Sequence, residues 1–249
     1  MYLSSDQCRI LPQIMATLAE PFDRETLRCR LGELLLKLLR ADFFASYQWS
    51  DTDARFVSRV SINMTDRNLH DYEKYYQFHD PITHVLRQRL APTRVTQILP
   101  QDKLRRTEFF NDFLWRDGLY WGLNLHIPVD GTSTADFRIW RSRVSSDFED
   151  DDLELLKMIT PAVSIALRRS HRREQIDATP ALQQIWHCAG LTARELETAM
   201  LAARGLPDKE IARQLGISFT TVRTHLKHAF RKLDLENRVQ LAASLRPPF

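Results

Sequence analysis

The sequence contains few of the residues that mark fibrous, disulfide-bonded or membrane proteins. Among 249 residues there are only 7 Gly and 11 Pro, which excludes a fibrous or low-complexity chain. The three cysteines, Cys8, Cys29 and Cys188, form no CxxC pair and are odd in number, which argues against a disulfide framework and a zinc site. No stretch approaches the roughly 18 apolar residues of a membrane span, and the N-terminus lacks a basic region followed by an apolar run. We therefore expect a cytoplasmic protein that does not enter a membrane.

The short motifs of common enzyme classes are absent as well. The chain has no GxSxG, HExxH, P-loop or GxGxxG motif, and its eight His residues show no metal-ligand spacing. These absences argue against an enzyme and predict neither a metal nor a cofactor. The composition, 43% hydrophobic and 27% charged, is that of an ordinary globular protein with one large or two modest domains.

The positive charge is concentrated near the C-terminus. The whole chain has 35 Lys and Arg against 32 Asp and Glu, a net charge of +3. Residues 191–249 contain ten basic and six acidic residues, a net +4, which leaves 25 against 26, or −1, for residues 1–190. The stretch from Glu174 to Gly190 contains Pro180 and has weak periodicity. We predict a first domain over residues 1–170, a linker over 171–190 and a second domain over 191–249.

Residues 1–170 show helical and strand patterns typical of an α+β domain. Leucines recur at helical spacing from Leu27 to Leu39, and the strand-like residues 43–49 and 55–62 flank a turn-forming segment. Alternating apolar residues over 119–129 and a return strand over 135–141 predict a second hairpin. Helices are expected around 108–115 and over 147–169. Helices segregated around hairpin-connected strands predict an antiparallel sheet.

The second domain contains two short helices joined by a tight turn. Thr192 and Glu195 form a capping box that starts a preceding helix, which Gly205 ends. A short helix is predicted over 208–215, a turn over 216–218, and a helix over 219–233 that Ser218 can cap. Two such helices, the second basic on its free face, are what a helix-turn-helix requires.

The second of these helices has the chemistry of a DNA reader. Its apolar residues Val222, Leu226, Ala229 and Leu233 are expected to face the core. Arg223 and Lys227 can donate to guanine, and Thr224 can contact a thymine methyl group. The predicted partner is therefore a double-stranded DNA operator. The predicted contact residues are Lys209, Thr220, Thr221, Arg223, Thr224, Lys227 and Arg231.

The segment from Leu191 to Leu245 resembles the four-helix DNA-binding domain of LuxR-type regulators, also called NarL-type. The resemblance covers about 55 residues without a gap. It implies that Arg223, Thr224 and Lys227 face the bases. It also implies that the final helix, from Asn237 to Leu245, makes a dimer contact. Pro207 stands where the family commonly has Ser or Thr as a helix cap. The matching residues are Leu191-Thr192, Arg194-Glu195, Gly205-Leu206, Lys209-Glu210-Ile211-Ala212, Leu215, Ile217-Ser218, Thr221-Val222, His225, Lys232-Leu233 and Asn237-Arg238.

The first domain is similar to the sensors that precede this DNA-binding domain in LuxR-type autoinducer receptors, which are α/β/α sandwiches of GAF- or PAS-like form. A phosphoreceiver domain is excluded, because the chain opens with a helix and hairpins instead of a βα repeat. An aromatic cluster precedes Asp80-Pro81. In the family this Asp accepts the amide N–H of an acyl-homoserine lactone, and Tyr72 is the nearest candidate for the preceding Tyr. The family's two Trp positions fall on Asn68 or Arg67 and near Val95.

The resemblance implies a small-molecule signal, either an acyl-homoserine lactone or another small organic ligand. An aromatic-lined pocket with one carboxylate is the usual form of such a site. The predicted ligand-binding residues are Tyr47, Tyr72, Tyr76, Asp80, Trp115 and Trp121. Two alternatives remain open: Asp80 and Pro81 simply start a helix that runs through Leu90, and the aromatic residues simply fill a core.

These observations together predict a homodimeric, sequence-specific transcription regulator whose first domain binds a quorum-sensing-like or other small-molecule signal. The alternative is a ligand-independent regulator whose first domain only dimerises or binds a protein partner.

Overall fold

The computed structural model describes residues 2–50, 54–130, 133–188 and 190–244, and it leaves the side chains of 175–188, 243 and 244 undescribed. The chain divides into two compact units, Met1–His171 and Arg172–Phe249. Helix α7 (Asp150–Cys188) contributes residues to both units. The helix predicted to end at Arg169 therefore continues, and the predicted linker is helical as far as Cys188. No glycine occurs between Gly131 and Gly190, and most residues of this stretch are good helix formers.

The first unit is built on a five-stranded sheet in the order β2-β1-β5-β4-β3, with every neighbouring pair antiparallel. The strands are β1 (Phe43–Ser50), β2 (Arg55–Ile62), β3 (Thr93–Arg94), β4 (Trp121–Pro128) and β5 (Ser133–Arg141). Both predicted hairpins are confirmed, although parts of their turns, at 51–53 and 131–132, lie outside the described residues. Strand β3 was not predicted, because two residues are too few to show an alternating pattern.

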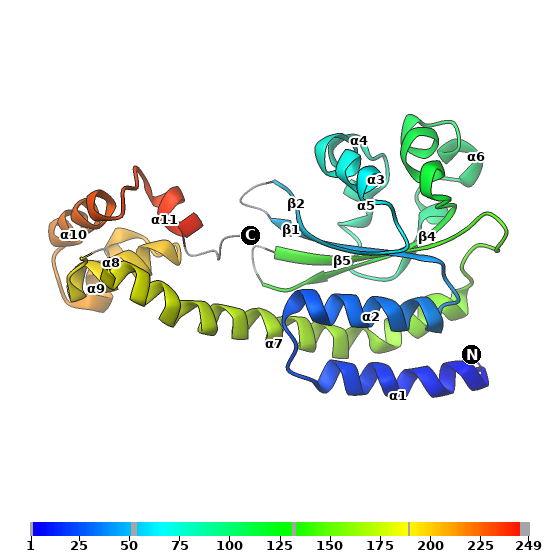
Figure 1. Ribbon diagram of the computed structural model, residues 1–249, viewed down its shortest axis with the longest axis horizontal. Helices are drawn as coiled ribbons and strands as arrows, with labels where there is room; N and C mark the ends of the chain where they lie inside the picture. Colours follow the sequence, from blue (N-terminus) through cyan, green and yellow to red (C-terminus); the bar gives the residue numbers. More distant parts are fainter. Residues whose placement is uncertain (1, 51–53, 131–132, 189, 245–249) are drawn as a thin grey trace. The chain divides into compact units, whose positions relative to one another are not determined.

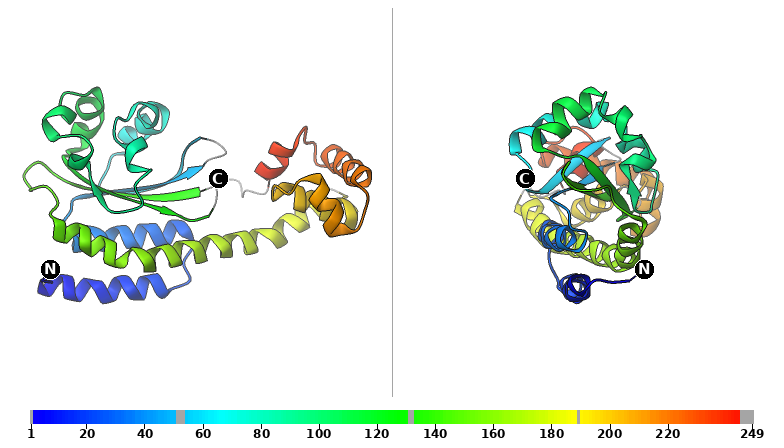
Figure 2. Two further views of the ribbon diagram at one scale, coloured as in Figure 1. Left: turned by 180° about the vertical axis from the view of Figure 1, so that it is seen from behind. Right: turned by 90° about the vertical axis from the view of Figure 1, so that its right-hand side faces the viewer.

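Helix α2 (Arg24–Leu38) and the first part of α7 cover one face of this sheet, and α1 (Ser5–Ala19) packs on the side of these helices that faces away from the sheet (Figure 1, Figure 2). The leucine pattern of α2 is confirmed, since Leu27, Leu31 and Leu35 are fully buried. They belong to one core with Phe44 on β1. Helix α2 approaches the sheet closely at Gly32, where a Cβ atom would lie only 2.5 Å from the Phe44 ring.

Short helical segments cover the opposite face of the sheet and enclose a second, aromatic core (Figure 1). The helix predicted around 108–115 is instead a π-helical turn followed by a 3₁₀ turn, and the helix predicted from Asp80 through Leu90 ends at Leu86. These layers confirm the α/β/α arrangement. The segments are α3 (Asp66–Asp71), the π-helical turn η1 (Tyr72–Tyr76), α4 (Gln77–His79), α5 (Thr83–Leu86), η2 (Val95–Gln97), α6 (Gln101–Leu104), the π-helical turn η3 (Phe109–Phe113) and η4 (Leu114–Asp117).

The second unit has a small core formed by four helices that follow α7. They are α8 (Ala193–Ala203), α9 (Asp208–Leu215), α10 (Phe219–Lys232) and α11 (Arg238–Ser244). Ala199, Ile211, Val222 and Leu241 are fully buried where the four helices meet. The predicted all-α helix-turn-helix domain is therefore present.

Candidate nucleic-acid interface and ligand cavity

The turn between α9 and α10 follows from its sequence. Gly216 ends α9 in the left-handed conformation, at φ +64°, which a residue without a Cβ adopts without strain. Two residues later the Ser218 hydroxyl oxygen accepts the N–H of Thr221 at 3.0 Å and caps α10. The two helices are thus joined by a short, locally satisfied turn.

Helix α10 separates its residues into a buried face and a basic exposed face. Val222, Leu226 and Ala229 are buried against the other helices. The predicted DNA-contacting residues on the other face, Thr220, Arg223, Thr224, Lys227 and Arg231, are all exposed. Lys209 is exposed on α9, and Thr221 is half-buried in the capping turn.

The cations of this face keep their charges available. Among the described residues, no salt bridge involves Arg223, Lys227, Arg231 or Lys209. The Arg223 guanidinium lies 5.6 Å from the centroid of the Phe219 ring, which is itself 41% exposed. Arg223, Lys227 and Arg231 also line a shallow hollow of this unit. Unpaired cations on an exposed helix face can contact phosphates and base edges without first breaking an internal ion pair.

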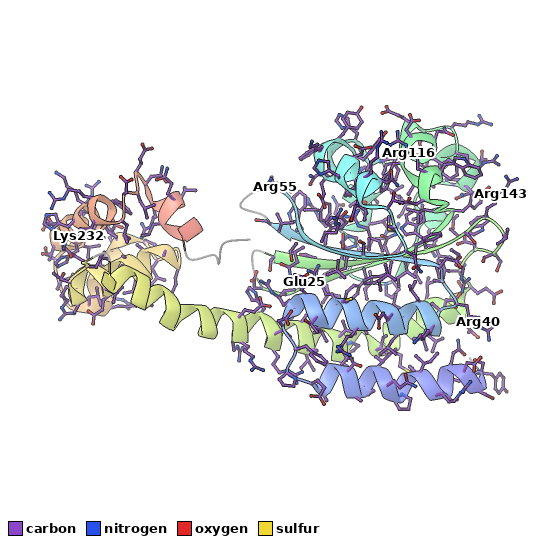
Figure 3. The ribbon with its side chains drawn as sticks, viewed as in Figure 1. Glu25, Arg40, Arg55, Arg116, Arg143 and Lys232 are labelled. Carbon is purple, nitrogen blue, oxygen red and sulfur yellow. The ribbon has the colours of Figure 1, made fainter. Side chains whose placement is uncertain are left out.

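Two buried networks fix α10 and its neighbours. Glu195, only 4% exposed, accepts the Lys232 Nζ at 2.6 Å and the backbone N–H of Thr192 at 2.8 Å. Figure 3 shows Lys232 within this unit. The hydrogen bond from Lys232, with the helix-capping bonds at Thr192, lowers the pKa of Glu195 to about 2. Lys232 also donates to the carbonyl of Gly190, so the C-terminal end of α10 is held to the start of the domain.

The second network compensates for the missing cap at Pro207, which provides no side-chain hydrogen bond to α9. Arg238 of α11 donates to Asp208 Oδ1 at 3.0 Å and to the carbonyl of Ala202 at 3.2 Å. It also donates to the carbonyl of Leu206. One guanidinium therefore ties the end of α8 and the start of α9 to α11.

The first unit encloses a cavity inside its aromatic core, between the sheet and the short helical segments. Its volume is about 20 Å³, enough for about one water molecule. Predicted residues Tyr47, Tyr72 and Asp80 line it, together with Ala45, Met64, Leu69, Ile82, Thr83, Phe109, Phe113, Leu119, Asn124, Arg138 and Trp140.

The carboxylate of Asp80 is largely occupied by its own segment. Its Oδ1 accepts the N–H groups of Ile82 and Thr83 at 2.8 and 3.1 Å, and its Oδ2 accepts the Thr83 hydroxyl at 2.5 Å. Burial raises the pKa of Asp80. The hydrogen bonds from Thr83 and Ile82, and the positive charge of the nearby Arg138, oppose that rise. Helix α5 begins at Thr83 with Ile82 as its N-cap, so Asp80 and Pro81 do not start it as the alternative interpretation expected. Asp80 instead fixes the turn before α5, while its side chain also lines the cavity.

A buried arginine on β5 is the main polar group of the cavity. Arg138 is 6% exposed and its Nε donates to Oδ2 of the fully buried Asp136 at 2.8 Å. The guanidinium carbon lies 4.8, 4.5 and 4.7 Å from the ring centroids of Tyr47, Phe56 and Tyr72. Burial alone lowers the pKa of Arg138, but the Asp136 carboxylate raises it, so the guanidinium stays charged.

The remaining predicted ligand residues lie outside this lining. Trp115 is 49% exposed on η4 and packs against Phe110. The indole N–H of Trp121 donates to the carbonyl of Ser145 at 2.9 Å. Tyr76 is buried but contacts Phe109 and Phe113 instead of lining the cavity. Aromatic character alone could not distinguish these positions.

Arg138 and Asn124 are the polar lining residues that the sequence reasoning missed. They are directly opposite each other across β4 and β5. In the sequence they are polar residues of the predicted strands 119–129 and 135–141, with Asp136 two positions before Arg138 on the same face. The sequence signal that could have identified them is the presence of polar residues at core-facing positions of two predicted neighbouring strands.

Neither a membrane helix nor a metal site is found in the part of the chain that the structure describes. None of its helices combines the length and the apolar character that a membrane span needs. No group of three or more His, Cys, Asp or Glu in that part is placed to hold a metal ion.

Comparison with known proteins identifies the C-terminal unit. Residues 189–245 match the model of the family described as bacterial regulatory proteins, luxR family. The C-terminal unit is therefore a LuxR-type DNA-binding domain. The chain is 27% identical over 183 residues to the monoamine regulon transcriptional regulator of Klebsiella aerogenes, covering 73% of this chain and 74% of that protein.

Solved structures of other proteins share the fold of this chain. Escherichia coli SdiA matches with a TM-score of 0.59 at 16% identity, over 95% of each chain, and SdiA has also been solved in complex with octanoyl-rac-glycerol. A GAF domain from a phosphoenolpyruvate-protein phosphotransferase of Coxiella burnetii matches 68% of this chain and 95% of its own, with a TM-score of 0.50 at 16% identity. The first unit therefore has a GAF-like fold.

Proposed function

We propose that this chain is a LuxR-type transcription regulator, that it binds a DNA operator through α10 as a homodimer, and that a small molecule in the cavity of the first unit controls that binding. The observation that carries the DNA role is the exposed face of α10, on which Arg223, Lys227 and Arg231 form no ion pair within the described structure. An α-helix fits the major groove of B-DNA, and cations on its free face meet both base edges and phosphates. Such a role belongs in the cytoplasm and requires no catalysis, metal or membrane.

The residues of this face have different roles in the proposed complex. Arg223 and Lys227 are one helical turn apart, close enough to the start of α10 for both to donate to guanine O6 and N7. Thr224 lies between them and contacts a thymine methyl group or donates its hydroxyl. Thr220, Thr221, Arg231 and Lys209 contact the phosphates on either side, which fixes the helix in the groove without reading sequence.

Substitution of the two base-facing cations tests the DNA role. We expect Arg223→Ala and Lys227→Ala each to weaken operator binding by about 5- to 150-fold, as for the loss of a base contact worth about 1–3 kcal/mol. Arg194→Ala is the matched control, because Arg194 is an exposed arginine of α8 that pairs with Glu197. Operator sites found by genome-wide footprinting supply the DNA for mobility-shift titrations. Equal affinities for wild type and both α10 variants would remove these residues from the interface.

Exposed apolar residues support the homodimer. Met158 and Ile165 are 50% and 68% exposed and lie seven residues apart on α7, and Val239 on α11 is 79% exposed. Apolar side chains repeated along one helix face are typical of a surface that a partner covers. We expect Ile165→Glu or Val239→Glu to shift the chain towards the monomer in sedimentation velocity. The control is Val144→Glu, at an isolated position that is 96% exposed. Dimers that persist in both variants would contradict these interfaces.

The buried cavity supports control by a small molecule. A binding site enclosed by aromatic residues with a few convergent polar groups is the common form of a ligand pocket. The rival function is a regulator whose first unit only dimerises or binds a protein. Footprinting with and without a small-molecule extract separates the two, because an unchanged footprint under every extract would favour the rival.

A further inference from the structure

The cavity of the first unit is surrounded by hydrogen-bond donors that have no partner. Asn124 Nδ2 and the hydroxyls of Tyr47 and Tyr72 are buried atoms that accept or donate no hydrogen bond within the described structure. These three residues line the same cavity, and each is at least nine-tenths buried. Arg138 lines it too, but its Nη2 is held 2.7 Å from Asp136 Oδ2 in an ion pair. A buried donor without an acceptor costs about 1–3 kcal/mol, so three of them around one cavity destabilise the protein when no ligand is bound.

These atoms lie close together in the fold. Asn124 and Arg138 are cross-strand partners on β4 and β5. The Arg138 guanidinium carbon is within 5 Å of the centroids of both tyrosine rings, at 4.8 and 4.7 Å. The side chains of three strands, β1, β4 and β5, and of η1 therefore meet at one place.

The acceptors of the cavity are already in use. Asp80 accepts three hydrogen bonds from Ile82 and Thr83. Asp136 accepts the backbone N–H of Tyr47 at 2.6 Å and the Nε of Arg138. A molecule that enters must bring an acceptor for Asn124 Nδ2, and further acceptors on it can take the O–H groups of Tyr47 and Tyr72, whereas both carboxylates are already hydrogen-bonded.

The charges around the cavity argue against a charged ligand. Arg138 already faces the buried carboxylate of Asp136, and Asp80 is a second buried carboxylate nearby. A ligand carboxylate would add a further buried negative charge beside a single guanidinium, which is costly. A ligand ammonium would find the aromatic rings of Tyr47, Phe56 and Tyr72 already covered by Arg138.

The walls and the volume indicate the shape of the ligand. Tyr72, Phe109, Phe113 and Trp140 are flat side chains that line the cavity. Because the enclosed 20 Å³ holds about one water molecule, any organic ligand requires the covering segments to move apart. Helices α4 and α5 among these segments are only three and four residues long. A compact ring needs less of this movement than a long acyl chain.

From these observations we infer that the cavity takes a compact, planar, uncharged molecule with two or more oxygen acceptors, anchored by Asn124 and the hydroxyls of Tyr47 and Tyr72. This inference rests on the proposed ligand-binding role of the first unit. It assigns the specificity to residues of β1, β4 and η1 instead of to the carboxylate of Asp80.

A set of probes that share one ring tests the inference on the full chain. Methyl benzoate carries an uncharged ester, benzoate a carboxylate and benzylamine an ammonium; an eight-carbon acyl-homoserine lactone represents a long-chain ligand. Binding is measured by thermal shift and by saturation-transfer NMR at millimolar probe concentrations. We expect methyl benzoate to bind more tightly than the other three probes.

Two variants connect the binding to the donors. Asn124→Leu removes one unpartnered donor at nearly constant volume. We expect it to weaken methyl benzoate binding by about two- to tenfold and to raise the melting temperature of the free protein. Tyr76→Phe is the matched control, because it removes a hydroxyl from the same aromatic core outside the cavity lining, and it should leave the affinity unchanged.

The possible failures are distinguishable. Binding of benzoate, benzylamine or the acyl-homoserine lactone at least as tight as that of methyl benzoate would overturn the inferred ligand class and leave the ligand-binding role intact. Unchanged affinity in Asn124→Leu would overturn the assignment of the anchor. Absence of binding by all four probes would overturn the inferred ligand class, whereas the proposed control by a small molecule fails only if the footprint stays unchanged under every extract.

Discussion

The buried contact between Glu195 and Lys232 gives a sharp prediction for the stability of the DNA-binding unit. Replacing Glu195 with Gln keeps the shape of the side chain and an acceptor for the Thr192 N–H, but removes the charge that faces Lys232 at 2.6 Å. The ordinary pKa of Glu is 4.5, and that of Glu195 in the folded protein is about 2. This difference corresponds to at most roughly 3 kcal/mol of stabilisation of the folded state. Because the Lys232 side chain is 29% exposed, solvent screens the pair, and we expect a loss of about 1–2 kcal/mol at pH 7.

The pH dependence of this loss has a definite sign. The folded pKa of Glu195 lies below its unfolded value, so its contribution is complete above pH 4.5 and disappears as the pH falls through about 2. The difference between wild type and Glu195→Gln should therefore shrink on acidification across this window. Lys232→Met, alone and combined with Glu195→Gln, isolates the coupling between the two residues in a double-mutant cycle.

Hydrogen exchange followed by mass spectrometry measures this effect, because it reports the opening of α8 and α10 separately from the first unit. Glu197→Gln is the matched control on the same helix, since Glu197 pairs with Arg194 while both side chains are about half exposed, at 51% and 56%. We expect this control to change stability by less than about 0.5 kcal/mol. Equal losses in the two Gln variants, or a Glu195→Gln difference that stays constant down to pH 2, would refute the assignment of a stabilising buried pair.

Two further predictions concern the first unit. Burial lowers the pKa of His126 to about 4, so the unfolded chain binds the proton first as the pH falls below 6.5, and the unit should lose up to about 3 kcal/mol between pH 6.5 and 4. The free energy of unfolding of His126→Leu, measured in urea, should lack this pH dependence. The same pH dependence in wild type and variant would exclude His126 as its source. Gly32→Ala should lower the melting temperature, despite the better helix propensity of Ala, because its Cβ would lie 2.5 Å from the Phe44 ring and overpacking costs about 1–3 kcal/mol. A higher melting temperature would show that α2 moves away from the sheet without cost.

The elements with strong local patterns could be predicted from the sequence. The hairpins follow from alternating apolar residues flanked by turn-forming residues, and α10 follows from the spacing of Val222, Leu226 and Ala229 below an exposed basic face. Thr192 and Glu195 form the expected capping box. In these segments the local preference and the tertiary packing agree, so the pattern alone was sufficient.

The cavity could be predicted only in part, because its lining is assembled by strand pairing. Tyr47, Tyr72 and Asp80 line it as expected, whereas Trp115 lies at the surface and Trp121 bonds to the loop after β5. No local pattern shows that Asn124 will lie opposite Arg138, since the register of β4 and β5 decides it. The π-helical turns were missed for a related reason, as they depend on aromatic packing instead of helical periodicity.

The outer strand β2 has a consequence for the behaviour of the protein at high concentration. An unpaired strand edge is a template on which another chain can add a strand, and this is a common start of aggregation. Here the N–H of Phe56 donates to the Gln77 side chain at 2.9 Å, and Ser58 interrupts the strand with a left-handed backbone at φ +53°. Arg55 (Figure 3) adds a cation near the start of the strand, and Arg59 adds a second one further along it. Because one N–H of β2 already has an acceptor, its backbone is irregular at Ser58 and it carries two cations, β2 is a poor template. The sheet should therefore remain five-stranded at high protein concentration.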